Sequence, residues 1–128
     1  MIKKIIKYTD YNGQQRKETA YFNLNKLEIL KLTAKLGMNI DDYTKKLAES
    51  EDMPKMLQFI EDIILMSYGE KSEDGRTFEK SKEKTAKFEN SNAFAELFEQ
   101  LLTNPQQTSQ FASGIVGVKK GAASPAAK

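Results

Sequence analysis

The sequence predicts an α+β fold, in which an N-terminal β-hairpin packs on a small bundle of about five or six helices. Residues 1–22 alternate apolar and polar side chains with the period of a strand, and a turn dipeptide divides them. From residue 23 onward the apolar residues recur with the period of a helix. The chain has 128 residues, 39% of them hydrophobic, which is enough for one domain with a buried core.

The first strand of the predicted hairpin has one apolar face. That face carries Ile2, Ile6 and Tyr8. Ile5 points to the other side. Asn12-Gly13 favours positive φ at two successive positions, so we expect a type I′ turn there. In that register Lys7 would lie opposite Glu18 as a favourable cross-strand pair.

The next segments have the start and stop signals of helices. Asn25 and Glu28 form a predicted capping box, and Gly37 ends the first helix. Its expected apolar stripe consists of Leu24, Leu27, Leu30, Ala34 and Leu36. A shorter helix is predicted over residues 41–49.

The most apolar helix of the chain is predicted to begin at Asp52 and Pro54. Its main apolar side carries Met53, Met56, Leu57, Ile60, Ile63 and Ile64. Because Phe59, Leu65 and Met66 lie elsewhere on the same helix, we expect it to be central. Gly69 is expected to end it as a left-handed cap.

Three more helices complete the predicted bundle. Residues 70–80 are expected to form a charged, turn-rich loop. The helices that follow are predicted over Ser81 to Phe88, Asn92 to Leu102, and Pro105 to about Ser113.

The domain organisation follows from these elements. We expect a single domain over residues 1–115, with the hairpin in 1–22 and the helices in 23–115. Residues 116–128 are rich in lysine and alanine and are predicted to be a flexible tail. Within it, Val118-Lys119-Lys120 can be encoded by a sequence on which a ribosome slips backward by one nucleotide.

The composition argues against an enzyme. The chain contains neither histidine nor cysteine, so the common general base and the usual transition-metal ligands are missing. Adjacent acidic pairs such as Glu61-Asp62 diverge on a helix and do not form a dyad. Residues from Glu70 resemble the start of a calcium loop, but Ser81 stands where a bidentate glutamate is needed. We therefore predict no catalysis, no metal and no cofactor.

Charge and hydropathy limit the possible partners. The net charge is +2, with basic residues in excess at both ends of the chain and acidic residues in the middle. No arginine cluster accompanies the basic ends, so nucleic acid is not an expected partner. No apolar run approaches the roughly 20 residues that cross a bilayer, so no membrane association is expected.

Two features could bind a protein partner. One is an apolar stripe near the C-terminus, made of Phe94, Leu97, Phe98 and Leu101 and followed by Phe111 and Ile115. This stripe can equally be part of the core. The other is the basic edge of the hairpin, since an unpaired strand can add to a neighbouring subunit.

Several blocks of sequence together resemble the tail assembly chaperones of siphophages that infect Gram-positive bacteria. The blocks are Tyr8–Gly13, Tyr21–Glu28, Tyr68–Phe78, Ala93–Phe98 and Phe111–Ile115. The resemblance covers about residues 1–115, and its most specific block is Tyr68–Phe78.

The resemblance implies a non-catalytic chaperone of the host cell cytoplasm, absent from the mature virion. Such a protein would bind the tape measure protein, help the tail tube protein to assemble around it, and self-associate along it. Family members are also similar in having a longer, frameshifted form. The alternatives are a structural virion component, such as a tail or head completion protein, and a small DNA-binding regulator.

Overall fold

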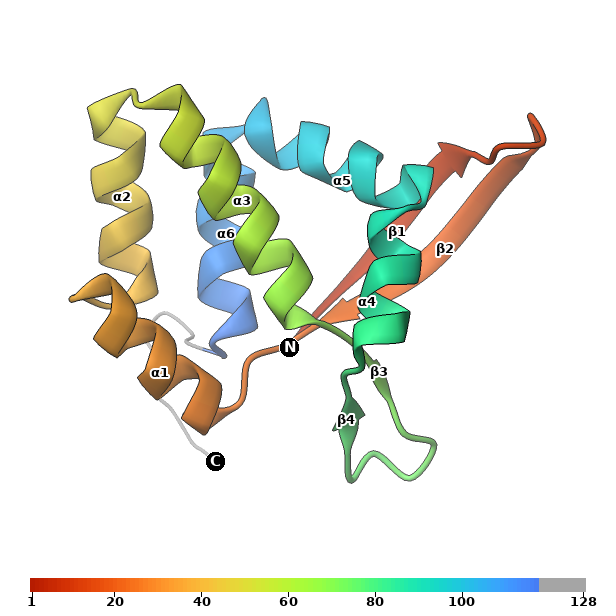
Figure 1. Cartoon of the computed structure of the whole chain (residues 1–128), viewed down its shortest axis with the longest axis horizontal. Helices are drawn as coiled ribbons and strands as arrows, with labels where there is room; N and C mark the ends of the chain where they lie inside the picture. The colour runs from red at the N-terminus through yellow and green to blue at the C-terminus, as the bar shows by residue number, and fades with distance from the viewer. Residues whose placement is uncertain (118–128) are drawn as a thin grey trace.

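The computed structural model describes residues 1–117, which form a sheet and a set of helices (Figure 1). The elements are β1 (Ile2–Thr9), β2 (Gln15–Phe22), α1 (Lys26–Leu36), α2 (Ile40–Ser50), α3 (Met53–Ser67), β3 (Tyr68–Lys71), β4 (Phe78–Glu79), α4 (Lys82–Glu89), α5 (Asn92–Leu102) and α6 (Pro105–Ile115). The strands pair in the order β1-β2-β3-β4, each antiparallel to the next. The predicted α+β class with an N-terminal hairpin is confirmed. Of the predicted tail 116–128, the part from residue 118 on, with its slip sequence, lies outside the described residues, whereas Val116 packs against the core.

The hairpin has a different turn and register from those predicted. A five-residue loop joins the strands, and within it only Gly13 has positive φ (81°), so the turn is not type I′. The Asp10 carboxylate accepts hydrogen bonds from the backbone N–H groups of Asn12 and Gln14, both at 2.9 Å. This longer loop shifts the ladder by one residue, so Lys7 lies opposite Lys17 and not opposite Glu18.

The predicted apolar stripe of the first helix is only partly buried: Leu24 is buried and Leu36 packs against the core. The capping box of this helix is confirmed, because Asn25 and the N3 residue Glu28 cap each other. Leu27 and Leu30, however, are 59% and 67% exposed, whereas Leu32 is buried. The helix carries two apolar rows, and the row through Leu32 is the one that faces the bundle.

The third helix ends by passing directly into a strand. Asp52 caps its start as predicted, but Gly69 is not a left-handed cap. Gly69 lies in β3, where the ring of Phe78 would stand 2.5 Å from an added Cβ atom. Part of the predicted loop 70–80 therefore forms β3 and β4, which extend the sheet beyond the hairpin. Helical periodicity could not indicate strands as short as these.

The remaining helices agree with the prediction within two residues. Ser81 caps α4 and Asn104 caps α6, each accepting a hydrogen bond from a backbone N–H in the first turn. The structure places α6 over Pro105–Ile115, slightly longer than expected, because Ile115 still packs into the core.

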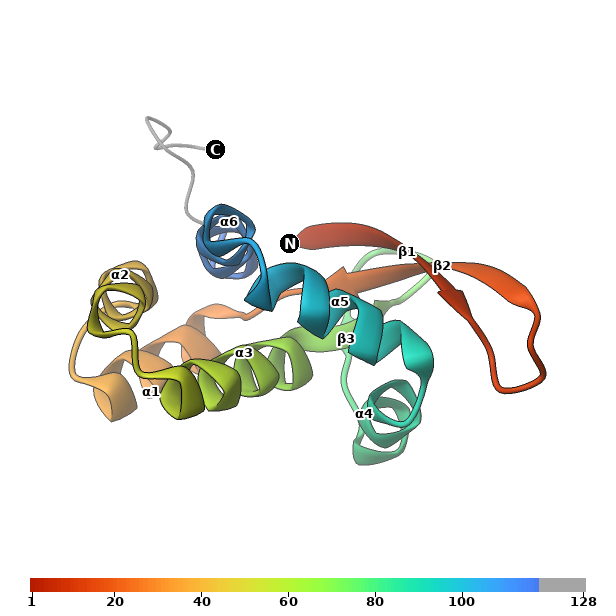
Figure 2. The same ribbon diagram turned by 90° about the horizontal axis from the view of Figure 1, so that it is seen from above.

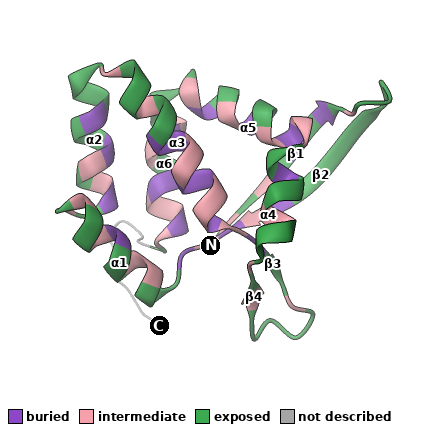
Figure 3. Ribbon diagram, in the orientation of Figure 1, coloured by how far each residue is buried: buried purple, intermediate pink, exposed green. Residues whose placement is uncertain are grey.

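The core lies where α3, α5 and α6 meet the inner face of the sheet (Figures 2 and 3). Ile60, Ile63 and Ile64 of α3 have no exposed surface, as expected of the central helix. Phe22 of β2 is also fully buried and contacts Phe111 edge-on, with ring centroids 5.2 Å apart. One apolar cluster thus ties the hairpin to the bundle.

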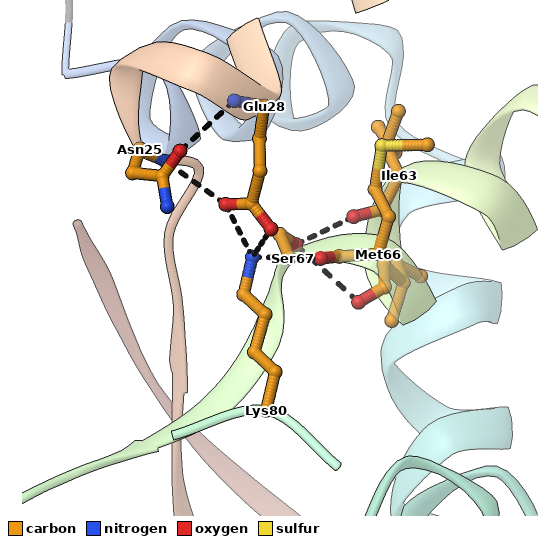
Figure 4. A network of polar contacts seen from close by, with 7 residues as sticks. Asn25, Glu28, Ile63, Met66, Ser67 and Lys80 are labelled. Atoms are coloured by element: carbon orange, nitrogen blue, oxygen red, sulfur yellow. Dashed lines mark hydrogen bonds and ion pairs between the residues drawn. The ribbon is translucent and has the colours of Figure 1, made fainter. Parts of the chain in front are cut away.

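A polar joint connects the start of α1, the end of α3 and the segment after β4 (Figure 4). The Lys80 ammonium donates to both carboxylate oxygens of Glu28 at 2.8 Å and to the carbonyl of Met66 at 2.9 Å. It therefore satisfies a carbonyl of the last turn of α3 while neutralising the acid of the α1 capping box. Nearby, the Ser67 carbonyl accepts a hydrogen bond from the Asn23 N–H at 2.8 Å.

Candidate partner-binding groove

The six residues predicted to bind a partner lie in one apolar cluster. Four of them have at most 1% exposed surface: Leu97, Leu101, Phe111 and Ile115. Phe94 and Phe98 are half-buried and contact each other edge-on, with ring centroids 5.7 Å apart. In this structure the four buried residues are core, the alternative that the sequence left open. Their role in partner binding stays a prediction, and it would require the core to open.

An accessible apolar groove lies at another place, where α2 ends, α3 begins and α5 meets α6. Its volume is about 410 Å³. The apolar residues that line it are Leu47, Ala48, Met53, Met56, Ile60, Leu101, Leu102 and Pro105. Leu101, from the predicted stripe, contributes to the floor together with Ile60, and neither has exposed surface. The groove therefore has a rigid apolar floor within the core.

The turn between α2 and α3 forms one wall of the groove. Glu51 adopts a left-handed conformation (φ 57°), the only described non-glycine residue with positive φ. Asp52 then caps α3, and Pro54 lies in the first helical turn. This geometry leaves Met53 57% exposed beside the opening. Methionine is flexible and polarisable, so such a wall can adapt to different apolar side chains.

The rim of the groove is predominantly acidic. Glu49, Glu51 and Asp52 line it, and Lys45 is the only basic residue among the residues that line it. An apolar segment with basic residues beside it would therefore complement the groove in both shape and charge.

The groove offers binding but no evident chemistry. Its buried hydroxyls are already engaged, since Thr44 donates to the Ile40 carbonyl and Thr108 donates to the Leu101 carbonyl. No nucleophile with an adjacent base lies among its lining residues. Within residues 1–117, no three acidic side chains converge in the way that a metal site requires. The groove is thus suited to holding an apolar surface.

Sequence reasoning missed the groove because it assigned Met53 and Met56 to the apolar side of a central helix. A local signal was present. Met53 directly precedes Pro54 at the start of the helix, where fewer neighbours are available to cover an apolar side chain than in its middle. Apolar residues in a first helical turn are therefore better candidates for exposure than those in the centre.

The comparison with protein families covers the hairpin, all described helices and the groove. A family model described as phage tail assembly chaperone matches residues 1–119. The chain belongs to this family. No curated protein and no solved structure gives a significant match. Family membership indicates that this chaperone acts during tail assembly through protein partners. None of its helices within residues 1–117 is long and apolar enough to cross a membrane.

Proposed function

We propose that this chaperone binds the tape measure protein in the groove and promotes assembly of the tail tube, without catalysing a reaction. The observation that carries the proposal is the accessible apolar groove of about 410 Å³ in a member of the tail assembly chaperone family. A long tail protein that is waiting for its tube has to be kept from aggregating. A groove that covers apolar side chains reversibly serves that purpose.

The occupant of the groove is a helical segment of the tape measure protein with an apolar stripe and flanking lysine or arginine residues. The apolar stripe follows from the accessible part of the lining, which offers Met53, Met56 and Leu102. The basic flanks follow from the rim, where Glu49 and Glu51 need partners of opposite charge.

The direct test is co-expression with the tape measure protein. Met53→Glu combined with Ala48→Glu places two charges in the groove at exposed positions. We expect this variant to lose most of its ability to keep the tape measure protein in the soluble fraction. The matched control, Leu27→Glu with Leu30→Glu, adds the same charges at exposed leucines of α1 outside the groove and should behave as the wild type.

Two outcomes decide the matter. If the groove variant is folded by circular dichroism and still keeps the tape measure protein soluble, the groove is not the binding site. If neither the variant nor the wild type affects tape measure solubility, the tape measure protein is not the partner.

One groove on each subunit is a small surface for a long partner, so we also expect self-association along the tape measure protein. The chaperone is expected in the host cytoplasm during assembly, where it also contacts the tail tube protein. Quantitative mass spectrometry of mature particles separates this function from that of a virion component. A chaperone should be nearly absent from them, whereas a tail or head completion protein should be present in stoichiometric amounts.

A further inference from the structure

The face of the sheet that points away from the helices has a composition of its own. Side chains alternate along a strand, so β1 residues with odd numbers and their partners on β2 share this face, opposite to buried Ile6 and Tyr8. We call it the outer sheet face. Its members are Lys3, Ile5, Lys7, Thr9, Gln15, Lys17, Thr19 and Tyr21 from the hairpin, and Gly69 and Lys71 from β3.

This face carries four lysines and no carboxylate. Lys7 lies directly opposite Lys17 in the ladder, where side chains of equal charge repel each other. None of the four forms an ion pair with another of the residues 1–117. On the inner face, by contrast, Lys84 bonds to Glu70 at 2.9 Å and to Glu79 at 3.2 Å. The ion pairs among the described sheet residues thus lie on the inner face of the sheet, and none of them lies on its outer face.

The lysines surround exposed apolar surface. Ile5 is 55% exposed and lies opposite Thr19, between the levels of Lys3 and Lys7. Ile5 stays exposed because the core packs on the other face, although Glu96 and Glu99 of α5 line a hollow together with Ile5 and Lys7 at the edge of the sheet. The outer sheet face therefore combines an apolar centre with a basic surround, the pattern of a surface that binds an amphipathic partner.

The outer half of the hairpin is accessible as well as charged. β3 pairs with β2 only at Tyr21 and Phe22, so residues 15–20 have no described strand on that side. The hairpin consequently projects beyond the helices (Figures 1 and 2). A partner can reach the face without displacing any described element.

We propose that the outer sheet face binds an acidic segment of a protein partner, in which carboxylates flank an apolar side chain. Carboxylates would neutralise Lys7 and Lys17 together, and the apolar side chain would cover Ile5. This surface is separate from the groove, which has an acidic rim and selects a basic segment. The two surfaces would allow one chaperone to hold two segments of opposite charge.

The geometry favours a protein over a nucleic acid. Base stacking needs a free aromatic ring, but the Lys71 ammonium lies 5.6 Å from the centroid of the Tyr21 ring. The nearby ring of Phe78 packs against Gly69 and has the Lys80 ammonium 5.9 Å from its centroid. The only arginine of the hairpin, Arg16, is bonded to Asp10 at 2.7 Å on the inner side.

The test measures the binding of defined probes to the full chain by fluorescence anisotropy. The acidic probe is a labelled eight-residue peptide that alternates glutamate with isoleucine, matched to the length of β1. Its counterpart alternates lysine with isoleucine, and a third probe is single-stranded DNA of similar length. We expect the acidic peptide to bind and its binding to weaken as salt is raised. The lysine peptide suits the acidic groove, so charge reversal at Lys7 and Lys17 should not weaken its binding. If the acidic peptide does not bind, the proposal is wrong.

Charge reversal locates the site. Lys7→Glu with Lys17→Glu should weaken binding of the acidic peptide by about tenfold or more, because attraction becomes repulsion. The matched control, Lys31→Glu with Lys46→Glu, makes the same change in net charge at exposed lysines of α1 and α2 and should leave binding unchanged. Equal weakening by both pairs would mean that only net charge matters, which overturns the proposal.

Two further variants separate a binding role from a structural one. Lys17→Glu alone should raise the melting temperature, since it converts a repulsive cross-strand pair into an attractive one, while it weakens peptide binding. Ile5→Ala should weaken binding of the acidic peptide and leave the fold intact. If DNA binds more tightly than the peptide and the Lys7/Lys17 variant loses that binding, the occupant is a nucleic acid and the proposal fails.

Discussion

The helical core and the outer half of the hairpin differ in how their side chains are buried and how their charges are arranged. In the core, Leu97 and Ile115 have no exposed surface, and apolar residues contact one another on all sides. In the hairpin, residues 14–19 are all exposed, and Lys7 is held against Lys17. An unfavourable charge pair can persist there because the folding free energy is supplied elsewhere. The regular apolar pattern thus marks the source of stability, and the outer half of the hairpin contributes little to it.

The largest effect on the free energy of unfolding is expected from a large-to-small substitution in the core. Leu97→Ala should lower the free energy of unfolding by about 2–5 kcal/mol, because a fully buried leucine leaves a cavity. Ile5→Ala, at an exposed position of the hairpin, should change it by less than about 0.5 kcal/mol. Urea unfolding followed by circular dichroism measures both. Similar losses for the two variants would contradict the division between a stabilising and a binding region.

A smaller loss is expected at the polar joint. Lys80→Ala removes three charge-assisted hydrogen bonds, to Glu28 and to the Met66 carbonyl, and should cost about 1–2 kcal/mol. Lys82→Ala, two residues later at an exposed position, is the matched control and should lie within about 0.5 kcal/mol of the wild type. If both variants unfold at the same urea concentration, the hydrogen bonds of Lys80 do not contribute measurably to the free energy of unfolding.

In the hairpin, reversing the charge of one lysine should raise the free energy of unfolding, whereas the two substitutions above lower it. Lys17→Glu is expected to stabilise the protein by about 0.2–1 kcal/mol, because glutamate would then face Lys7. The gain should shrink in high salt, where the pair is screened. Lys31→Glu on α1 serves as a control for net charge. A loss of stability specific to Lys17→Glu would mean that the lysine has a structural role that the ladder does not reveal.

The smallest expected effect is a local dependence on pH at the hairpin turn. The hydrogen bond from Arg16 and the backbone N–H of Gln14 lower the pKa of Asp10 below its ordinary value of 3.8. A lowered carboxyl pKa stabilises the fold above pH 3.8, and this stabilisation is lost as the pH falls through the folded-state pKa. The protection of the Asn12 and Gln14 amides against exchange, relative to the intrinsic exchange rate at each pH, should therefore fall in acid. In Asp10→Ala this protection should be low already near pH 5 and show no such transition.

Much of the fold could be predicted because its signals are local. Caps at Asn25, Asp52 and Asn104 and the spacing of apolar residues define the helices to within a few residues. The wrong predictions concern residues whose environment is set by a contact with a residue far away in the sequence. The role of Gly69 depends on Phe78, and the face that α1 buries depends on the bundle against which it packs.

The candidate site was harder to predict than the fold. Periodicity locates an apolar face but does not say whether another element covers it, so it left open whether Phe111 binds a partner or lies in the core, where the structure places it. Met53 was expected in the core and lines an open groove for the same reason. The hairpin register, wrong by one residue, concealed the facing lysines that distinguish the outer sheet face.

The contact between the first strand and the last helix has a consequence for synthesis. Ile2 packs so closely on Gly114 that an added Cβ there would collide with its side chain, and the Leu24 N–H donates to the Ile115 carbonyl at 2.8 Å. A growing chain on the ribosome cannot make these contacts until α6 has emerged. The apolar face of the hairpin thus stays uncovered during most of translation, and a truncation before Pro105 should yield a chain that aggregates. The folding of this protein therefore depends on the emergence of α6.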